Sequence, residues 1–435
     1  MSRNASSVVL ALWLLGVSTP GIGAPRTGFV PDAVVYPVGA FPQDVLNVQA
    51  AVDGGGNVLL KSTDSAGAPT PFEFGTGRVF LTQDVSINGE TVNGLMTTIH
   101  RGVQPFRSVF GLPVTSAIQG IHFDGPVSAA VFLGFSRGFQ FRGNLVSDVV
   151  GARFGGQTKG QAVWVTEGVV PGGVSGTIVI ADNVVERVFA DLSYGVAFAV
   201  WDASTEITRN VFRDVKDTGI LAVGGSQPIS IVDNVVLGGA PYPGFFSVGN
   251  GIVAGLGAGA IYIARNTVVC DNPFADGIAI EGVVDFNPAL GGLPNEVPAS
   301  AVVEKNDVTM HGSLFGGITI YGQLTSSLIS NNQVAGDGGF AFGILPFFGD
   351  EVADGTVYRG NNISRFHASD ADVFLDYTAQ DTVFVGRAGT LVDFGAGNRI
   401  TGFTNMAGGA GPSIRAAQQQ KRTLLQTLGT ILPDR

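Results

Sequence analysis

The residues best suited to chemistry in this chain are aromatic rings and carboxylates that recur near the ends of short apolar segments. They are Trp164, Glu167, Trp201, Asp202, Glu281, Tyr321, Asp376 and Tyr377. Aromatic rings stack on the apolar faces of sugars, while carboxylates accept hydrogen bonds from hydroxyls or serve as acid and base. On one outer face, these residues would form a ligand-binding row for a glycan. The alternative is inward-facing tryptophans and scattered surface carboxylates, because a one-residue shift in register turns each side chain over.

Three residues are weak candidates for acid or base catalysis, namely Asp202, Glu281 and His311. Paired carboxylates in glycosidases lie about 5 to 9.5 Å apart, so the spacing of the elements that carry Asp202 and Glu281 decides whether they can cooperate. A lone histidine is more often structural than catalytic. Acidic pairs, Asp214 with Asp217 and Asp370 with Asp372, are typical of solvated loops, so we predict no metal site.

A recurring asparagine indicates which elements position these residues. Each copy has a large apolar residue three places before it and another two places after it, and successive copies are 24 to 40 residues apart. Self-similarity at this period indicates a solenoid, a propeller or another repeat array. The copies are Asn144, Asn183, Asn210, Asn234, Asn266, Asn306 and Asn332, with Asn361 and Asn398 as degenerate continuations.

The residues around each asparagine predict a strand that bends there and continues. Asparagine suits such a corner because it tolerates left-handed backbone angles and bonds neighbouring backbone groups. When coils stack, corner amides can bond one another in a structural ladder. A further apolar strand beginning with glycine follows most corners, as at Gly219, Gly251, Gly277, Gly317 and Gly343.

Three short strands per coil, joined by loops of unequal length, predict an all-β, right-handed parallel β-helix. Asp202 and Glu281 would then lie three coils apart, or about 14 Å at the spacing of paired strands, which disfavours them as a hydrolytic pair. The longest insertions, residues 237–250 and 283–299, are expected to protrude as loops.

The sequence also predicts how the chain is divided. Residues 1–24 contain Arg3, a short apolar run and small residues at the end, which is typical of a signal peptide. An N-terminal segment spans 25–43, and the β-helix domain spans 44–405. Within it, residues 44–52 have apolar positions at helical spacing and precede a glycine run, which favours a short capping helix. Residues 406–435 are expected to form a helical cap or a tail.

Composition narrows the partners and the location. The net charge is −11 and charged residues make up only 14% of the chain, which argues against nucleic acid or an anionic membrane as partner. We expect a secreted, periplasmic or cell-surface protein that does not insert into a membrane after signal cleavage. Cys270 is the only cysteine, so no intrachain disulfide can form.

The corners, the Gly-Ile strands and the entry Val48-Gln-Ala-Ala-Val-Asp-Gly-Gly-Gly-Asn-Val-Leu-Leu resemble the pectate-lyase-like superfamily of right-handed parallel β-helix proteins. The resemblance covers roughly residues 40–405 and implies the fold. That superfamily includes lyases, hydrolases, epimerases and non-catalytic surface proteins, so it does not select a function. The strings typical of its polygalacturonases, such as Asn-Thr-Asp and Gly-His-Gly, are missing here.

Two functions therefore remain open. The first is an exported protein that binds, and in some form processes, an extended polysaccharide or cell-surface glycan along one face, as a lyase or a hydrolase if it is an enzyme. The second is a non-catalytic structural or matrix protein. No cofactor is predicted, except Ca²⁺ if the protein is a lyase, and the oligomeric state is left open.

Overall fold

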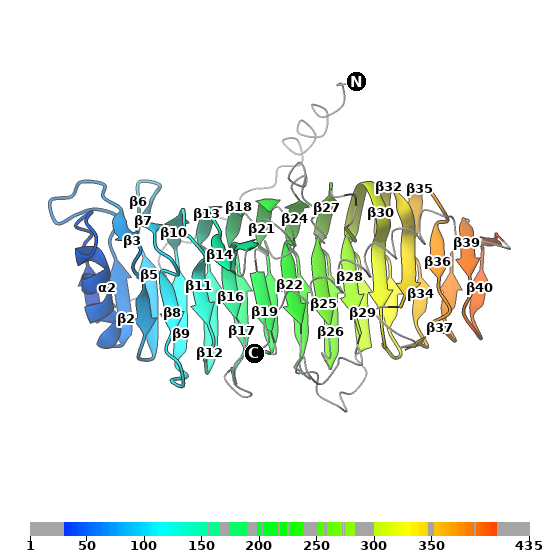
Figure 1. The fold of residues 1–435 in the computed structure, drawn as a ribbon, viewed down its shortest axis with the longest axis horizontal. Coiled ribbons are helices and arrows are strands. Elements are labelled where there is room, and N and C mark those ends of the chain that lie inside the picture. Colours follow the sequence, from blue (N-terminus) through cyan, green and yellow to red (C-terminus); the bar gives the residue numbers. More distant parts are fainter. Residues whose placement is uncertain are drawn as a thin grey trace, which may run out of the picture.

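The computed structural model describes residues 30–154, 157–165, 174–188, 198–201, 203–215, 218–223, 227–238, 251–255, 259–271, 273, 275–282, 300–346, 352–386 and 389–406. These residues form the right-handed parallel β-helix predicted from the sequence, an elongated stack of coils with one strand on each of three faces (Figure 1). The predicted signal peptide and C-terminal helix, and most of the two predicted loops, lie outside the described residues. No helix among the described residues is long and apolar enough to cross a membrane.

The first face precedes the asparagine corners. Its strands pair in parallel, in the order β1 (Ala33–Val35), β2 (Gly56–Leu60), β5 (Val85–Gly89), β9 (Thr115–Gln119), β12 (Gly138–Arg142), β17 (Ile178–Ala181), β20 (Thr205–Thr208), β23 (Ile229–Val232), β26 (Ala260–Ala264), β29 (Ser300–Glu304), β31 (Leu328–Ser330), β34 (Val357–Arg359), β38 (Val383–Val385) and β40 (Arg399–Thr401).

The second face follows the corners. It contains β3 (Phe72–Gly75), β7 (Leu95–Arg101), β10 (Ile121–Asp124), β13 (Leu145–Val149), β18 (Val184–Val188), β21 (Val211–Val215), β24 (Val235–Gly238), β27 (Thr267–Cys270), the first parts of β30 (Asp307–Tyr321) and β32 (Gln333–Leu345), and β35 (Asn362–Ala368).

The third face carries the predicted Gly-Ile strands. It contains β4 (Val79–Leu81), β8 (Phe106–Ser108), β11 (Ala129–Leu133), β16 (Gln161–Val165), β19 (Phe198–Trp201), β22 (Ile220–Val223), β25 (Ile252–Gly255), β28 (Ile278–Glu281), the last parts of β30 and β32, β36 (Val373–Leu375), β39 (Thr390–Asp393) and β41 (Thr404–Asn405). Short additional pairings are made by β6 (Thr91–Val92) with β7, β14 (Ala152–Phe154) with β15 (Gln157–Lys159), and β33 (Ala353–Asp354) with β37 (Ala379–Gln380).

The predicted capping helix is α2 (Gln43–Asp53), which covers the first coil at one end of the stack (Figure 1). Its Val48 and Val52 are fully buried in the same core as the strands. Asp44 is also fully buried, and its carboxylate accepts hydrogen bonds from the backbone amides of Val38, Ala40 and Glu73. The helix therefore seals the coil and anchors the segment that precedes it.

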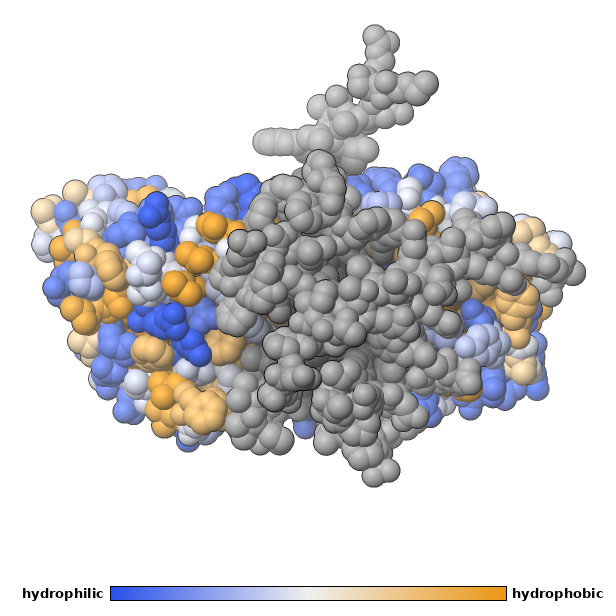
Figure 2. Space-filling model, in the orientation of Figure 1, coloured by the Kyte–Doolittle hydropathy of each residue, from blue (hydrophilic) through white to orange (hydrophobic). Residues whose placement is uncertain are grey.

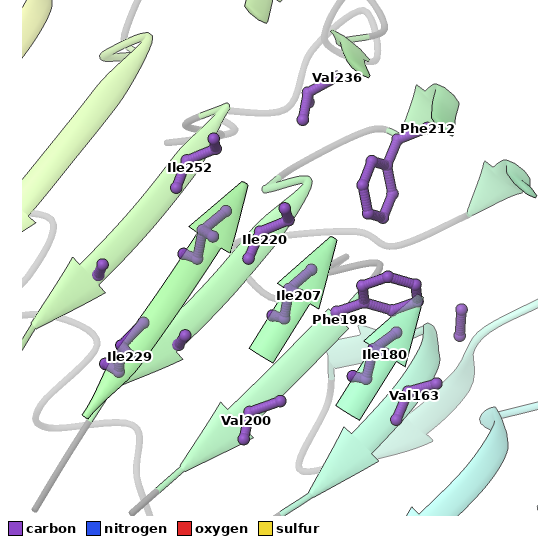
Figure 3. Packing of buried hydrophobic residues seen from close by; sticks show 14 of the residues in the cluster. Val163, Ile180, Phe198, Val200, Ile207, Phe212, Ile220, Ile229, Val236 and Ile252 are labelled. Atoms are coloured by element: carbon purple, nitrogen blue, oxygen red, sulfur yellow. The ribbon is translucent and has the colours of Figure 1, made fainter. Parts of the chain in front are cut away.

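Inward side chains of all three faces fill the coils. Figure 3 shows how equivalent positions stack from coil to coil, with Ile180 next to Ile207 and Phe198 next to Ile220. Most of these side chains are completely inaccessible to water. Because each coil buries its apolar residues against its neighbours, the core is continuous along the stack.

The asparagine ladder is present over the seven predicted members and includes the predicted continuation at Asn361. The Oδ1 atom of each corner asparagine accepts hydrogen bonds from the backbone N–H and the side-chain amide of the previous one, as Asn210 does from Asn183 at 3.0 and 2.8 Å. The last such step joins Asn332 to Asn361. At the next corners the pattern changes, and Asn398 accepts from the backbone of Thr382.

One detail of the predicted corner was wrong. The left-handed residue is the one before each asparagine, with φ between 55° and 60° at Asp182, Arg209, Asp233, Arg265 and Lys305. The asparagines themselves do not take positive φ at these corners. The reason is that the amide must point inward along the stack to bond the next coil, which leaves the sharp turn to the residue outside it.

Candidate functional site

The predicted ligand-binding residues of the third face fall into two columns of register positions. Trp201, Glu281 and Tyr321 share one register position, separated by Val223 and Gly255 on the intervening coils. Trp164 belongs to the neighbouring column, where it pairs with Phe132 and Ala199. Glu167 and Asp202 lie outside the described residues, and only the backbone of Trp201 is described. The described members therefore follow one face but not one continuous line.

Trp164 lies on the outer face and not in the core. Its strand neighbours Val163 and Val165 are fully buried, whereas its own ring is half-buried. The ring of Phe132 meets it edge-on with 4.9 Å between centroids, and the guanidinium of Arg107 lies 5.0 Å from the centre of the Phe132 ring. Arg107, Phe132 and Trp164 therefore stack across three coils, and part of the Trp164 indole stays accessible to solvent.

Tyr321 is held in a buried polar cluster. Its ring is only 2% exposed, and its hydroxyl donates to Asp276 Oδ2 at 2.7 Å. The other carboxylate oxygen of Asp276 accepts from the Thr319 hydroxyl at 2.5 Å and from the Gly316 amide at 3.1 Å. Burial and the nearby Asp276 carboxylate raise the pKa of Tyr321 well above its ordinary value. Tyr321 thus ties two coils together, next to the half-buried Glu281.

The remaining predicted site residues are dispersed. Asp376 is almost buried and accepts from the backbone of Tyr377, whose side chain is exposed. His311 lies on the second face, away from Glu281 on the third, and its Nδ1 is 2.5 Å from Asp271 Oδ1. Ligand binding and catalysis by these residues stay predictions.

Of the two acidic pairs, Asp370 and Asp372 are described, whereas Asp217 lies outside the described residues. Asp372 accepts hydrogen bonds from the backbone amide and the hydroxyl of Thr390. Across the described residues, no group of three or more His, Cys, Asp or Glu side chains is arranged to hold a metal ion.

The basic residues at the corners are neutralised by their neighbours. Arg209 forms a two-pronged ion pair with Asp182, and Arg265 forms the same pair with Asp233. These ion pairs stabilise the protonated guanidinium group, and the pair with Asp182 raises the pKa of Arg209. From Asp182 to Arg265 the corner residues alternate in charge, so these four do not form a basic stripe for an anionic ligand.

A different line of side chains, which sequence reasoning missed, forms a more complete site. Six successive coils of the second face carry a hydrogen-bonding side chain at the same register position, and five of these side chains are partly exposed, whereas Ser147 is only 3% exposed. We call it the polar row, and it consists of Glu73, His100, Asp124, Ser147, Glu186 and Arg213.

The first three members of the polar row form a cluster around an imidazole. His100 Nδ1 lies 2.7 Å from Glu73 Oε2, and His100 Nε2 lies 4.0 Å from Asp124 Oδ2. All three side chains are partly exposed, at 28% for Glu73, 36% for His100 and 39% for Asp124. At the other end of the row, Arg213 donates to Glu186 at 2.7 Å.

A groove of about 320 Å³ opens beside this cluster. His100 and Asp124 form one side of it, and hydroxyl and apolar side chains form the rest: Ser62, Thr70, Leu95, Met96 and Thr98 among them. A larger cavity of about 810 Å³ near the last coils is lined by aromatic residues such as Phe342 and Phe384 and by polar residues such as Asn361 and Asp372. The groove differs from it in lying beside the polar row, where titratable and hydroxyl side chains meet apolar ones.

His122 supports the middle of the polar row. Its side chain points outward because it alternates with the buried Ile121 and Phe123, and its Nε2 lies 2.9 Å from the Ser147 hydroxyl. Burial lowers the pKa of His122 below its ordinary value. The same alternation around Ile99-His100 would have placed His100 outward, but only the register between coils aligns it with Glu73 and Asp124.

Comparison with known proteins adds little to this geometry. No protein-family model and no curated protein sequence matches the chain. Among solved structures, it is similar to the A-module of the mannuronan C-5 epimerase AlgE4 of Azotobacter vinelandii, with 14% identity and a TM-score of 0.42 over 88% of this chain and 96% of that one. A likeness of this size carries no inference about activity.

Proposed function

We propose that this protein is exported and binds an extended polysaccharide along the polar row of its second face. The observation that carries the proposal is the in-register alignment of five partly exposed hydrogen-bonding side chains, from Glu73 to Arg213, on six consecutive coils whose sixth member is the buried Ser147. Strands in a sheet lie about 4.8 Å apart, so the row is about 24 Å long and suits a linear polymer better than a small molecule. Export is supported by the signal-like residues 1–24.

The groove at the start of the row would hold one sugar unit of this polymer. Hydroxyls of Thr70 and Thr98 can exchange hydrogen bonds with a sugar, and Leu95 and Met96 offer it an apolar contact. Such a mixture of few polar groups and apolar surface is typical of ligand sites.

The two carboxylates beside His100, those of Glu73 and Asp124, are not arranged as a hydrolytic pair. Glu73 and Asp124 are two coils apart, about 9.6 Å at the spacing of paired strands. This is at the upper limit for an inverting pair, but the His100 ring occupies the space that a water molecule and a sugar would need. We therefore propose binding as the function, with no cleavage step assigned and with Ca²⁺ required only if a lyase activity is found.

Binding is tested with the full-length protein against a panel of neutral, anionic and amino polysaccharides, by affinity electrophoresis and calorimetry. We expect at least one polymer to bind, and we expect Asp124→Ala and Glu186→Ala to weaken that binding at least tenfold. The matched control is Asp271→Ala, which removes a similarly exposed, histidine-paired carboxylate that follows β27 on a distant coil of the same face.

Two results would contradict the proposal. One is a panel in which no polysaccharide binds, which would favour a structural or matrix protein. The other is a polysaccharide whose affinity falls equally in the control and in the two row variants.

A further inference from the structure

The His100 cluster contains two hydrogen-bond acceptors that face each other. A carboxylate only accepts, so the 2.7 Å contact with Glu73 requires a proton on His100 Nδ1. In the neutral ring, Nε2 then carries a lone pair and accepts. Asp124 Oδ2 lies 4.0 Å from this nitrogen, which is too far for a hydrogen bond between them. The site therefore lacks a donor at the point where Nε2 and the Asp124 carboxylate converge.

A single donor atom fits this point. An atom at a normal hydrogen-bond distance of about 2.8 Å from both acceptors can bridge a gap of 4.0 Å. An ammonium group offers three donors and a positive charge, whereas a hydroxyl offers one donor and no charge. Bonds to a charged donor are also about twice as strong as neutral ones, which favours the ammonium.

The charges around the groove also favour an ammonium group as the donor. Lys61 is paired with Glu90 and Arg187 with Asp148, whereas the exposed Arg101 follows His100 at the end of the same strand. Glu73 and Asp124 place two carboxylates on either side of the His100 ring. Such a site repels a carboxylate or sulfate group and attracts a cation.

The wall of the groove contains a second unfilled position. Ser62 is only 2% exposed, and its hydroxyl has no hydrogen-bond partner among the described residues. Buried polar groups are nearly always paired, so an unpaired hydroxyl on the wall of a groove is consistent with a polar ligand. A volume of about 320 Å³ is at the lower end of the range for small-molecule sites.

We infer that the groove binds an amino sugar unit, with the sugar ammonium bridging His100 Nε2 and the Asp124 carboxylate. This inference rests on the proposed polysaccharide function and names the class of polymer, one with free amino groups. It excludes polyuronates and sulfated glycans as the preferred ligands of this site.

The test compares four polymers of matched length: polyglucosamine, its fully N-acetylated form, a neutral β-glucan and a polyuronate. We expect polyglucosamine to bind at least tenfold more tightly than the N-acetylated form, which is about 1.4 kcal/mol. Asp124→Asn keeps the shape of the side chain but removes its charge, and should abolish most of this preference. Monomeric glucosamine should also shift the imidazole NMR signals of His100.

The matched control addresses the general attraction of an acidic protein for a polycation. Asp271→Asn removes one carboxylate that is 40% exposed and lies beside His311, compared with 39% for Asp124 beside His100. It should leave the preference unchanged. Equal binding of the amino and N-acetylated forms, or equal effects of the two Asn variants, would overturn the inference.

The outcomes separate this inference from the proposed function. If the glucan or the polyuronate binds best and the row variants weaken it, the polysaccharide function stands and the amino-sugar assignment falls. If none of the four polymers binds, both fall.

Discussion

Replacing Asn234 by alanine removes the centre of the asparagine ladder. Its side-chain amide donates to Asn266 Oδ1 at 3.0 Å, to the Ile207 carbonyl at 3.0 Å and to the Val232 carbonyl at 3.1 Å. Its Oδ1 accepts from the backbone and side-chain nitrogens of Asn210 at 3.0 and 2.9 Å. The residue is fully buried, so water does not compete for these bonds.

The cost depends on which partners keep another bond. The Asn210 side chain still donates to two carbonyls, and Asn266 Oδ1 still accepts from the Asn234 backbone. The Asn210 backbone amide and the Ile207 carbonyl each lose a buried partner. A buried polar group left unpaired costs about 1–3 kcal/mol, so we expect Asn234→Ala to destabilise the protein by about 2–4 kcal/mol. From the sequence alone, which shows one amide per corner, the expected destabilisation is only about 1 kcal/mol, because that is the net contribution of a single hydrogen bond.

The assay is chemical denaturation followed by circular dichroism and tryptophan fluorescence, since coincident transitions show that one unfolding free energy is meaningful. Asn362→Ala is the control, because Asn362 is an exposed asparagine of the same stack whose side chain bonds only Ser364 among the described residues. The same measurement is made for Asn210→Ala and Asn266→Ala. If all three variants lose no more than about 0.5 kcal/mol of unfolding free energy relative to the control, the ladder is not a source of stability. Surface substitutions usually change the unfolding free energy by no more than this amount.

Further predictions concern other parts of the fold and are measured by the same denaturation assay. Arg209→Val should destabilise the protein by about 1–2 kcal/mol more than Arg209→Gly, because both lose the exposed ion pair with Asp182 but only valine strains the left-handed corner; equal losses would contradict this. Tyr321→Phe should cost about 1–3 kcal/mol, since it removes a donor from the buried Asp276 carboxylate, and an unchanged stability would argue against the cluster. Because burial lowers the pKa of His122, the unfolded state binds a proton first as the pH falls below about 6.5, so stability should decrease there. His122→Gln should remove that part of the pH dependence, and an identical slope in the variant would exclude His122 as its source.

The outer surface shows why the candidate site was harder to predict than the fold. On the coloured parts of the face in Figure 2, hydrophilic and hydrophobic residues are interspersed, so no single patch marks a binding surface. His100, Glu73 and Asp124 are 24 to 51 residues apart in the sequence, and none of them belongs to a recognisable motif. Trp164, in contrast, lies on the outer face, one of the two orientations that the sequence left open.

The sequence by itself determined the coil. An asparagine with apolar residues at fixed offsets specifies a corner between two strands, and this local rule holds at every copy from Asn144 to Asn332 because each coil repeats the same environment. The capping helix over Gln43–Asp53 was equally local, since its apolar spacing and glycine stop lie within one segment.

Only the tertiary structure decided which residues of different coils share a position. That register depends on the lengths of the loops between strands, and these vary from coil to coil, so Glu73, His100 and Asp124 become neighbours only after the coils have stacked. The tertiary structure also decided that the residue before each asparagine takes the left-handed conformation, and that Arg209 forms an ion pair with Asp182 of the previous coil. Local patterns fix which way a side chain points, whereas its partners are fixed by the stacking of the coils.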